Sequence, residues 1–217
     1  MAPSPRAQRV LAALLKPAVW IGGLLPLALL VGAIATGTIS QEPIEDLTHR
    51  TGKAALTLLL ATLAMTPVRR LTGWNGIVPA RRPLGLFAFF YACLHFLVYL
   101  FDQGFAPGYI VEDVAEHPYV TAGFAALVLL VPLALTSTRG WIRRLGKGWQ
   151  KLHRLVYLAA ALGVVHFLWG VKKDLREPLI YAAVLAALLA FRLPQLRKRR
   201  AQAKAARVRM ESDAQAA

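Results

Sequence analysis

The sequence predicts an all-α integral membrane protein, with six transmembrane helices in one bundle and both termini in the cytoplasm. Hydrophobic residues make up 57% of the 217 residues and charged residues only 17%, whereas a soluble domain carries about a quarter charged residues. Apolar stretches of membrane-spanning length recur along the chain, and basic residues gather in alternate loops between them. Together these observations predict a multi-pass membrane protein.

Six apolar stretches are expected to cross the membrane as helices. A helix needs about 20 apolar residues to span roughly 30 Å of hydrocarbon, and a helix meets its own backbone hydrogen bonds in lipid. Pro26 and Pro132 fall inside two of the stretches, where we expect kinks. We place the spans near residues 17–36, 53–68, 84–101, 118–136, 152–170 and 178–193.

The charge distribution predicts the orientation. With the N-terminus inside, 21 of the 26 basic residues fall on the cytoplasmic side, whereas 9 of the 11 acidic residues fall outside. This asymmetry follows the positive-inside rule, and attraction to anionic lipid accounts for the net charge of +15 without a nucleic-acid partner. The expected plan is a cytoplasmic tail at 1–16, the transmembrane domain at 17–194 and a basic cytoplasmic tail at 195–217.

Three histidines fall within the predicted spans. His95 and His166 belong to the outer halves of the third and fifth spans, and His153 lies near the cytoplasmic end of the fifth. On a continuous helix, His153 and His166 are about 20 Å apart, at ~1.5 Å per residue. A histidine inside a span indicates either a functional site or a hydrogen bond between helices. Two histidines at one depth on different helices favour a shared ligand.

Haem suits such a pair, because it needs one or two axial side chains and an apolar slot. Phe87, Tyr91 and Tyr99 follow His95's face of the third span at steps of four. Gly163, one turn before His166, leaves room for a flat macrocycle. The sequence shows no obvious internal repeat, and its single cysteine, Cys93, cannot form an internal disulfide.

Several longer motifs identify a family. The chain resembles the small haem-binding membrane subunits of bacterial methionine sulfoxide reductase systems, which belong to the ferric-reductase-like transmembrane family. The resemblance covers all but the first span and the tails, and LGKGWQKLHRLVYL is its most specific stretch. The stretches are HRTGKAAL (49–56), ATLAMTP (61–67), RRPLG (81–85), LHFLVY (94–99), TST (136–138), LGKGWQKLHRLVYL (145–158), VHFLWGVK (165–172) and PLIYA (178–182).

The resemblance implies a place in the bacterial inner membrane, haem b, bound FMN, and electron supply to a periplasmic molybdopterin-containing enzyme that reduces methionine sulfoxide in proteins. The family's haem-iron histidines carry over to His95, His153 and His166. Larger ferric reductases place two histidines on each of the third and fifth spans, but the third span here holds only His95. We therefore expect His95 and His166 to be axial ligands of one haem, and His153 to serve a second haem or an inner cofactor.

The electron donor and the flavin site are less direct expectations. The sequence contains no nucleotide-binding motif, so the donor is expected to be membrane quinol or a separate cytoplasmic flavin reductase. Basic residues on the inner face are candidates for the FMN phosphate, with Trp149 stacking on the ring: Arg81, Arg82, Lys147 and Lys151. His49, at the outer face, is a candidate for partner docking or quinone binding.

On this interpretation the protein is a redox subunit and not the catalytic subunit of the system. The alternative is a non-redox six-helix membrane protein, such as a small permease or an assembly factor, with structural histidines. A haem absorption band that shifts on reduction distinguishes the two functions.

Overall fold

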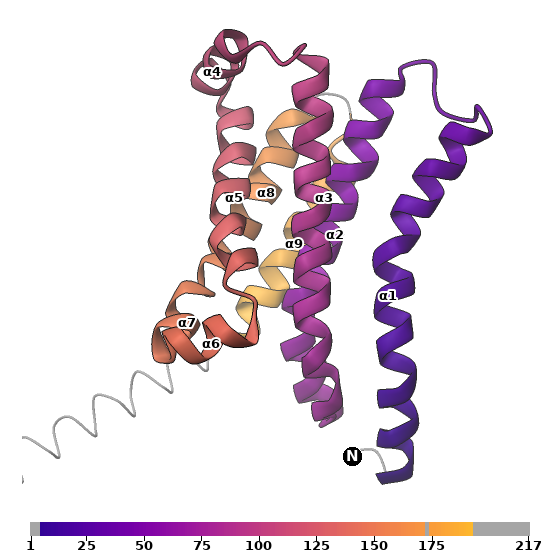
Figure 1. Cartoon of the computed structure of the whole chain (residues 1–217), viewed down its shortest axis with the longest axis vertical. Coiled ribbons are helices and arrows are strands. Elements are labelled where there is room, and N and C mark those ends of the chain that lie inside the picture. The colour runs from indigo at the N-terminus through magenta and orange to yellow at the C-terminus, as the bar shows by residue number, and fades with distance from the viewer. Residues whose placement is uncertain (1–4, 172–173, 193–217) are drawn as a thin grey trace, which may run out of the picture.

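The computed structural model describes residues 5–171 and 174–192, which form helices and connecting turns (Figure 1). The long helices are α1 (Pro5–Ala35), α2 (Pro43–Thr72), α3 (Arg81–Asp102), α5 (Pro118–Leu135), α8 (Leu155–Gly170) and α9 (Arg176–Ala190). The short helices are η1 (Asn75–Ala80), α4 (Pro107–Glu116), α6 (Arg139–Leu145) and α7 (Lys147–Leu152).

Five helical segments of the described residues are long and apolar enough to cross a membrane, which makes the chain a multi-pass membrane protein. They are Ala13–Ala35, Pro43–Thr72, Asn75–Asp102, Pro118–Leu135 and Lys147–Gly170. The sixth predicted span corresponds to α9, whose 15 residues fall short of the about 20 that a spanning helix needs. The sixth span therefore stays a prediction, and the predicted tail at 195–217 lies outside the described residues.

Two antiparallel helix pairs form the centre of the bundle. The most extensive helix contacts are those of α2 with α3 and of α5 with α8. Small residues lie where the pairs meet: Ala88, Ala159 and Ala160 are almost fully buried, and side chains of this size let transmembrane helices approach closely. Helix α9 packs against α2 and α8, and α1 lies at the edge of the bundle (Figure 1).

Helix α1 is joined to the bundle by a tyrosine inserted into its backbone ladder. Tyr91 Oη donates to the carbonyl oxygen of Gly23 at 2.7 Å and accepts from the Leu27 N–H at 2.9 Å. In a regular helix these two backbone groups bond to each other, so the hydroxyl replaces that bond beside Pro26. An inserted side chain next to proline is a known cause of helix bending.

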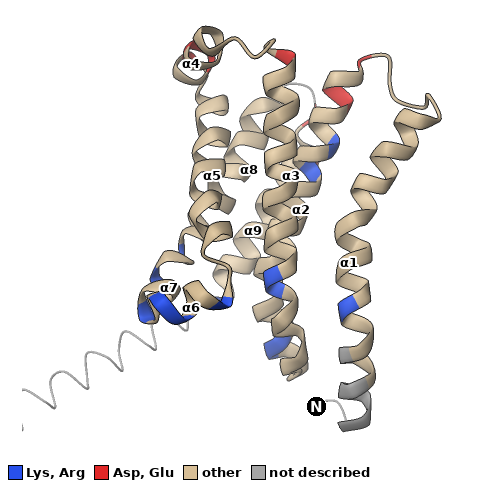
Figure 2. Ribbon diagram, viewed as in Figure 1, with Lys and Arg blue, Asp and Glu red and all other residues tan. Residues whose placement is uncertain are grey.

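Charge separates along the bundle (Figure 2). Acidic residues of the described part gather at the end that carries α4, whereas basic residues concentrate at the end of α6 and α7. This is the asymmetry that the positive-inside rule requires. The assignment of the basic end to the cytoplasm remains a prediction.

The connections differ from the expectation in three places. Helix α1 begins at Pro5, inside the predicted tail, so the helix extends beyond its apolar part. The segment between the third and fourth spans contains α4, which we expected as a loop. The fifth span is interrupted, because His153 and Arg154 form a turn between α7 and α8.

Candidate functional site

A cavity opens between α2, α3, α5 and α8, and both outer histidines line it. Its volume is about 410 Å³, within the range of small-molecule and cofactor sites. Its deeper wall is apolar, and its mouth, at the end of the bundle that holds the acidic residues, is polar. The mouth includes His49, Lys53 and Asp113.

His95 and His166 approach each other across this cavity, and each makes the same kind of hydrogen bond to a backbone carbonyl. Their ring centroids are 5.9 Å apart, and the ring planes are at 78°. His95 Nδ1 lies 3.0 Å from the carbonyl oxygen of Thr48, and His166 Nδ1 lies 2.7 Å from that of Tyr119. A carbonyl can only accept, so each Nδ1 carries the hydrogen and each Nε2 is left with its lone pair.

This arrangement fits a metal held between two imidazoles. A metal bound on each side at about 2 Å by an imidazole nitrogen separates the two ring centres by roughly 6 Å, close to the spacing observed. An Nδ1–H bonded to a carbonyl is also the usual support of a histidine ligand. The described residues contain no cluster of three or more His, Cys, Asp or Glu side chains. A cofactor that needs two axial ligands and an apolar slot, such as haem, therefore fits this cavity.

The residues that line the cavity form an internal repeat, although no repeat was expected from the sequence. Each histidine follows the residue whose carbonyl it contacts by 47 positions, and the second set follows the first by 71, as from His95 to His166. Seven lining pairs at this offset share their residue type: Gly52 and Gly123, Ala55 and Ala126, Leu56 and Leu127, Leu59 and Leu130, Ala88 and Ala159, His95 and His166, Phe96 and Phe167. The pair α2–α3 is therefore the counterpart of the pair α5–α8.

The predicted aromatic face beside His95 is wrong for two of its three members. Phe87 packs edge-on against Trp20 at 5.4 Å, and Tyr91 bonds to α1, so neither lines the cavity. Tyr99 does line it, and its hydroxyl donates to Asp113 Oδ2 at 2.6 Å. Gly163 also lines the cavity, as expected. Four-residue steps drift around a helix, and the neighbouring α1 decided which aromatic residues face inward.

His153 lies apart from this cavity, beside the inner end of the bundle. Its ring stacks on Trp149 with centroids 3.9 Å apart, and its Nδ1 lies 3.2 Å from the Trp149 carbonyl oxygen. Its Nε2 is buried and makes no hydrogen bond of normal geometry in the described part of the chain, although the Leu133 backbone lies near enough to act on the imidazole. His153 and Arg154 form a turn with right-handed helical backbone angles, so the stretch from His153 to His166 is not one regular helix.

Two arginines near His153 carry buried polar atoms without partners. Arg81 Nε and Arg192 Nε are buried and have no hydrogen bond within the described residues. The other nitrogens of Arg192 donate to the Tyr157 hydroxyl and, at 2.8 Å, to the Leu63 carbonyl oxygen. From the sequence, Arg192 was expected only as one of the basic residues of the cytoplasmic side. Since no acidic side chain lies at this end of the described bundle (Figure 2), a bound anion would stabilise the cluster.

The remaining predicted FMN residues are not brought together as one pocket. Arg82, Lys147 and Lys151 are exposed. The Trp149 indole donates to the Thr136 carbonyl oxygen at 2.9 Å, and His153 covers one of its faces. Of the predicted basic residues, Arg81 lies near enough to His153 for its charge to act on the imidazole.

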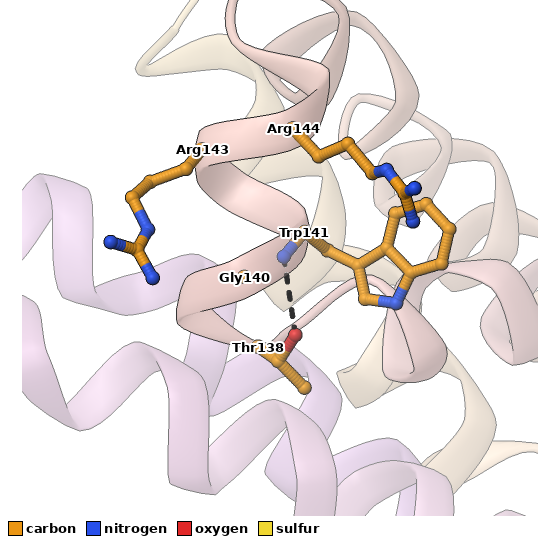
Figure 3. Close-up of a pocket in the computed structure, with 5 residues that line it drawn as sticks. All are labelled: Thr138, Gly140, Trp141, Arg143 and Arg144. Carbon is orange, nitrogen blue, oxygen red and sulfur yellow. Dashed lines mark hydrogen bonds between the residues drawn. The ribbon is translucent and has the colours of Figure 1, made fainter.

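A second depression lies over α6, and Figure 3 shows the five residues that line it. Arg144 sits over the Trp141 ring, 5.5 Å from its centroid, whereas Arg143 points away from the ring. The backbone N–H of Trp141 donates to Thr138 Oγ1 at 3.3 Å, and this hydrogen bond caps the helix. None of the predicted cofactor residues lines this depression.

His49 is at the mouth of the main cavity and is partly exposed. Its Nε2 is 3.5 Å from Glu45 Oε1. At the offset of 71 its counterpart is Val120, and that of the neighbouring Lys53 is Phe124. The repeat therefore breaks at the mouth, where α2 supplies polar groups and α5 apolar ones.

Comparisons with known proteins agree with this geometry. The family described as ferric reductase like transmembrane component matches residues 51–164, which include α3 and α5 and most of α2 and α8. No solved structure matches the chain.

Curated relatives carry a more specific name, protein-methionine-sulfoxide reductase heme-binding subunit MsrQ. The relative from Deinococcus radiodurans is 53% identical over 175 residues, covering 80% of this chain and 87% of the relative. The relative from Rhodospirillum rubrum is 53% identical over 186 residues, covering 84% and 89%. The one from Bordetella pertussis is 47% identical over 193 residues, covering 88% and 94%. The chain belongs to the ferric-reductase-like transmembrane family and, within it, to the MsrQ family.

Proposed function

We propose that the protein is the haem b and FMN electron-transfer subunit of a protein-methionine-sulfoxide reductase system. It passes electrons from the quinone pool or from a cytoplasmic flavin reductase to a periplasmic molybdopterin-containing catalytic subunit. The observation that carries the proposal is the pair His95 and His166, whose rings are 5.9 Å apart in one apolar cavity. The printed names of the relatives, heme-binding subunit, support the choice of haem.

The residues of the chain have separate tasks in this function. Haem, when bound, supplies the one-electron chemistry. His95 and His166 hold the iron through Nε2, while the carbonyl oxygens of Thr48 and Tyr119 fix the two imidazoles. The apolar wall excludes water from the site. The position of the cavity towards the end that carries α4 puts the electron exit on the periplasmic side in the predicted orientation.

The inner end of the bundle is proposed as the site of electron entry. His153 resembles the outer histidines, because its Nδ1 is also bonded to a backbone carbonyl and its buried Nε2 makes no hydrogen bond of normal geometry within the described residues. Arg81 and Arg192 supply guanidinium groups for an anionic cofactor: the carboxylates of a second haem or the phosphate of FMN. Four further residues at the inner end remain peripheral candidates for the FMN site: Arg82, Lys147, Trp149 and Lys151. His49, outside the repeated histidine arrangement, remains the candidate for partner docking or quinone binding.

A stepwise electron-transfer experiment tests the proposal. Haem and flavin are quantified per chain in detergent-purified protein, and the absorption spectrum is recorded before and after dithionite. The protein is then reduced with a quinol, or with a flavin reductase and NAD(P)H, and mixed with the periplasmic subunit. We expect reoxidation of the haem only when the catalytic subunit and a methionine-sulfoxide protein are both present. A colourless protein from cells supplied with haem would instead support a permease or assembly factor with structural histidines.

A further inference from the structure

His95 and His166 each contact a backbone carbonyl that lies four residues before a glycine. His95 contacts the carbonyl of Thr48, and Gly52 follows one turn later on α2. His166 contacts the carbonyl of Tyr119, and Gly123 occupies the same place on α5. The coincidence is part of the 71-residue repeat, so the two hairpins hold their histidines in the same way.

The glycines matter because of the direction of helix side chains. A Cβ leans toward the helix N-terminus and lies over the preceding turn, which here is the turn of the contacted carbonyl. A methyl group added at Gly123 would lie 2.7 Å from His166 Nδ1 and 2.9 Å from its Cε1. One added at Gly52 would lie 3.1 Å from both His95 Nδ1 and Cε1. Any side chain at these positions therefore meets the imidazole at its hydrogen-bonding edge.

We propose that Gly52 and Gly123 are positioning residues of the haem site, which let the imidazoles of His95 and His166 reach the backbone carbonyls and thereby orient Nε2 toward the iron. The hydrogen bond also raises the basicity of the ligating nitrogen. The inference rests on the proposed function, because it assumes that these histidines hold one haem.

The space for an added methyl group is smaller at Gly123 than at Gly52, so the two alanine variants are expected to differ in the size of their effect. At 2.7 Å the His166 ring must move, and it then loses a hydrogen bond of 2.7 Å. At 3.1 Å a shift of a few tenths of an ångström relieves the contact at His95. Gly123→Ala is therefore expected to perturb the site strongly, and Gly52→Ala mildly.

The test compares these variants with two helix glycines away from the histidines. Gly32 on α1 has no atom within 4 Å of an added Cβ, and for Gly85 on α3 the nearest is Thr62 Cγ2 at 3.8 Å. Haem per chain, the g-values of the ferric low-spin signal and the midpoint potential are measured for each alanine variant, together with helix content by circular dichroism. Weakening an outer-shell partner of a metal ligand typically costs about 10–100-fold in affinity, which is the expected loss for Gly123→Ala.

Gly52→Ala is expected to retain haem but to show altered g-values and a raised midpoint potential, because the less basic imidazole stabilises ferric iron less. Gly32→Ala and Gly85→Ala should match the wild type. Wild-type g-values and potential in Gly52→Ala, whether or not Gly123→Ala folds, would overturn the inference, since a packing glycine affects stability alone. If the wild-type protein lacks haem, or retains it without His95 or His166, the proposed function itself fails.

Discussion

His153 and Trp149 stack with their ring centroids 3.9 Å apart and their planes at 27°. The same tryptophan supplies the carbonyl oxygen that His153 Nδ1 contacts at 3.2 Å. One residue thus fixes both the tilt of the imidazole and its tautomer, and Nε2 remains buried. His95 and His166 are held in a similar way by backbone carbonyls, and we propose that His153 serves a separate, inner site.

Replacement of His153 by alanine should separate the inner site from the outer one. We expect the spectrum of the outer haem to persist after dithionite, because His153 does not line that cavity. Reduction by quinol or by the flavin reductase should slow or stop. His117→Ala, at an exposed histidine of the outer end, serves as the control. Normal donor reduction with unchanged haem and flavin content would show that His153 is structural.

Arg81→Gln should weaken binding of the anionic inner cofactor. A charge-assisted hydrogen bond contributes about 1.5–3 kcal/mol, roughly a 10- to 150-fold change in affinity. The matched control is Arg82→Gln, because Arg82 carries the same charge on the same helix but is exposed. Flavin and haem per chain are measured in both variants. Equal losses in the two variants would mean that only the net charge of this face matters.

The orientation of the bundle predicts which loops are reached from outside. In a Cys93→Ser background, cysteines placed at Asn75 and Ser137 should escape a membrane-impermeant thiol reagent applied to intact spheroplasts. A cysteine at Gly108, in the first turn of α4, should react. The expectation follows from the positive-inside rule. The opposite labelling pattern would reverse the proposed direction of electron flow.

Tyr91→Phe should loosen α1 from the bundle. The hydroxyl is buried and satisfies both the Gly23 carbonyl and the Leu27 N–H, so its removal is expected to cost about 1–3 kcal/mol. Thermal unfolding in detergent, followed by circular dichroism, measures the loss. Tyr109→Phe is the control, since Tyr109 is 69% exposed. Equal unfolding temperatures for Tyr91→Phe and the wild type would contradict the role of the inserted hydroxyl.

Hydropathy and charge predicted much of this fold because both act locally along the chain. The spans containing His95 and His166 could be located by length and composition, and their similar depth followed from span direction. Helix α4 was missed because it is short and lies outside the long apolar stretches. The break after α7 was missed because turn residues 153 and 154 carry no Gly or Pro signal.

The residues that support the site could not be predicted in the same way. The hydrogen bonds of His95 to α2 and of His166 to α5 depend on which helices pair, which periodicity does not reveal. The repeat was missed because its most similar stretches, GKAALTLL at 52–59 and GFAALVLL at 123–130, match mainly through Ala and Leu, which are common in any membrane helix. Arg192 was missed as a site residue because its neighbours come from distant parts of the chain, Leu63 and Tyr157.

The ligation of one haem by His95 and His166 is tested most directly by the ferric spectrum of detergent-purified protein. Optical and electron paramagnetic resonance spectra are compared for the wild type, His95→Ala, His166→Ala and the control His49→Ala. We expect a six-coordinate low-spin haem in the wild type and in His49→Ala, and loss of that haem's signal in each of the other two variants. Retention of the full six-coordinate signal in both His95→Ala and His166→Ala would contradict this ligation.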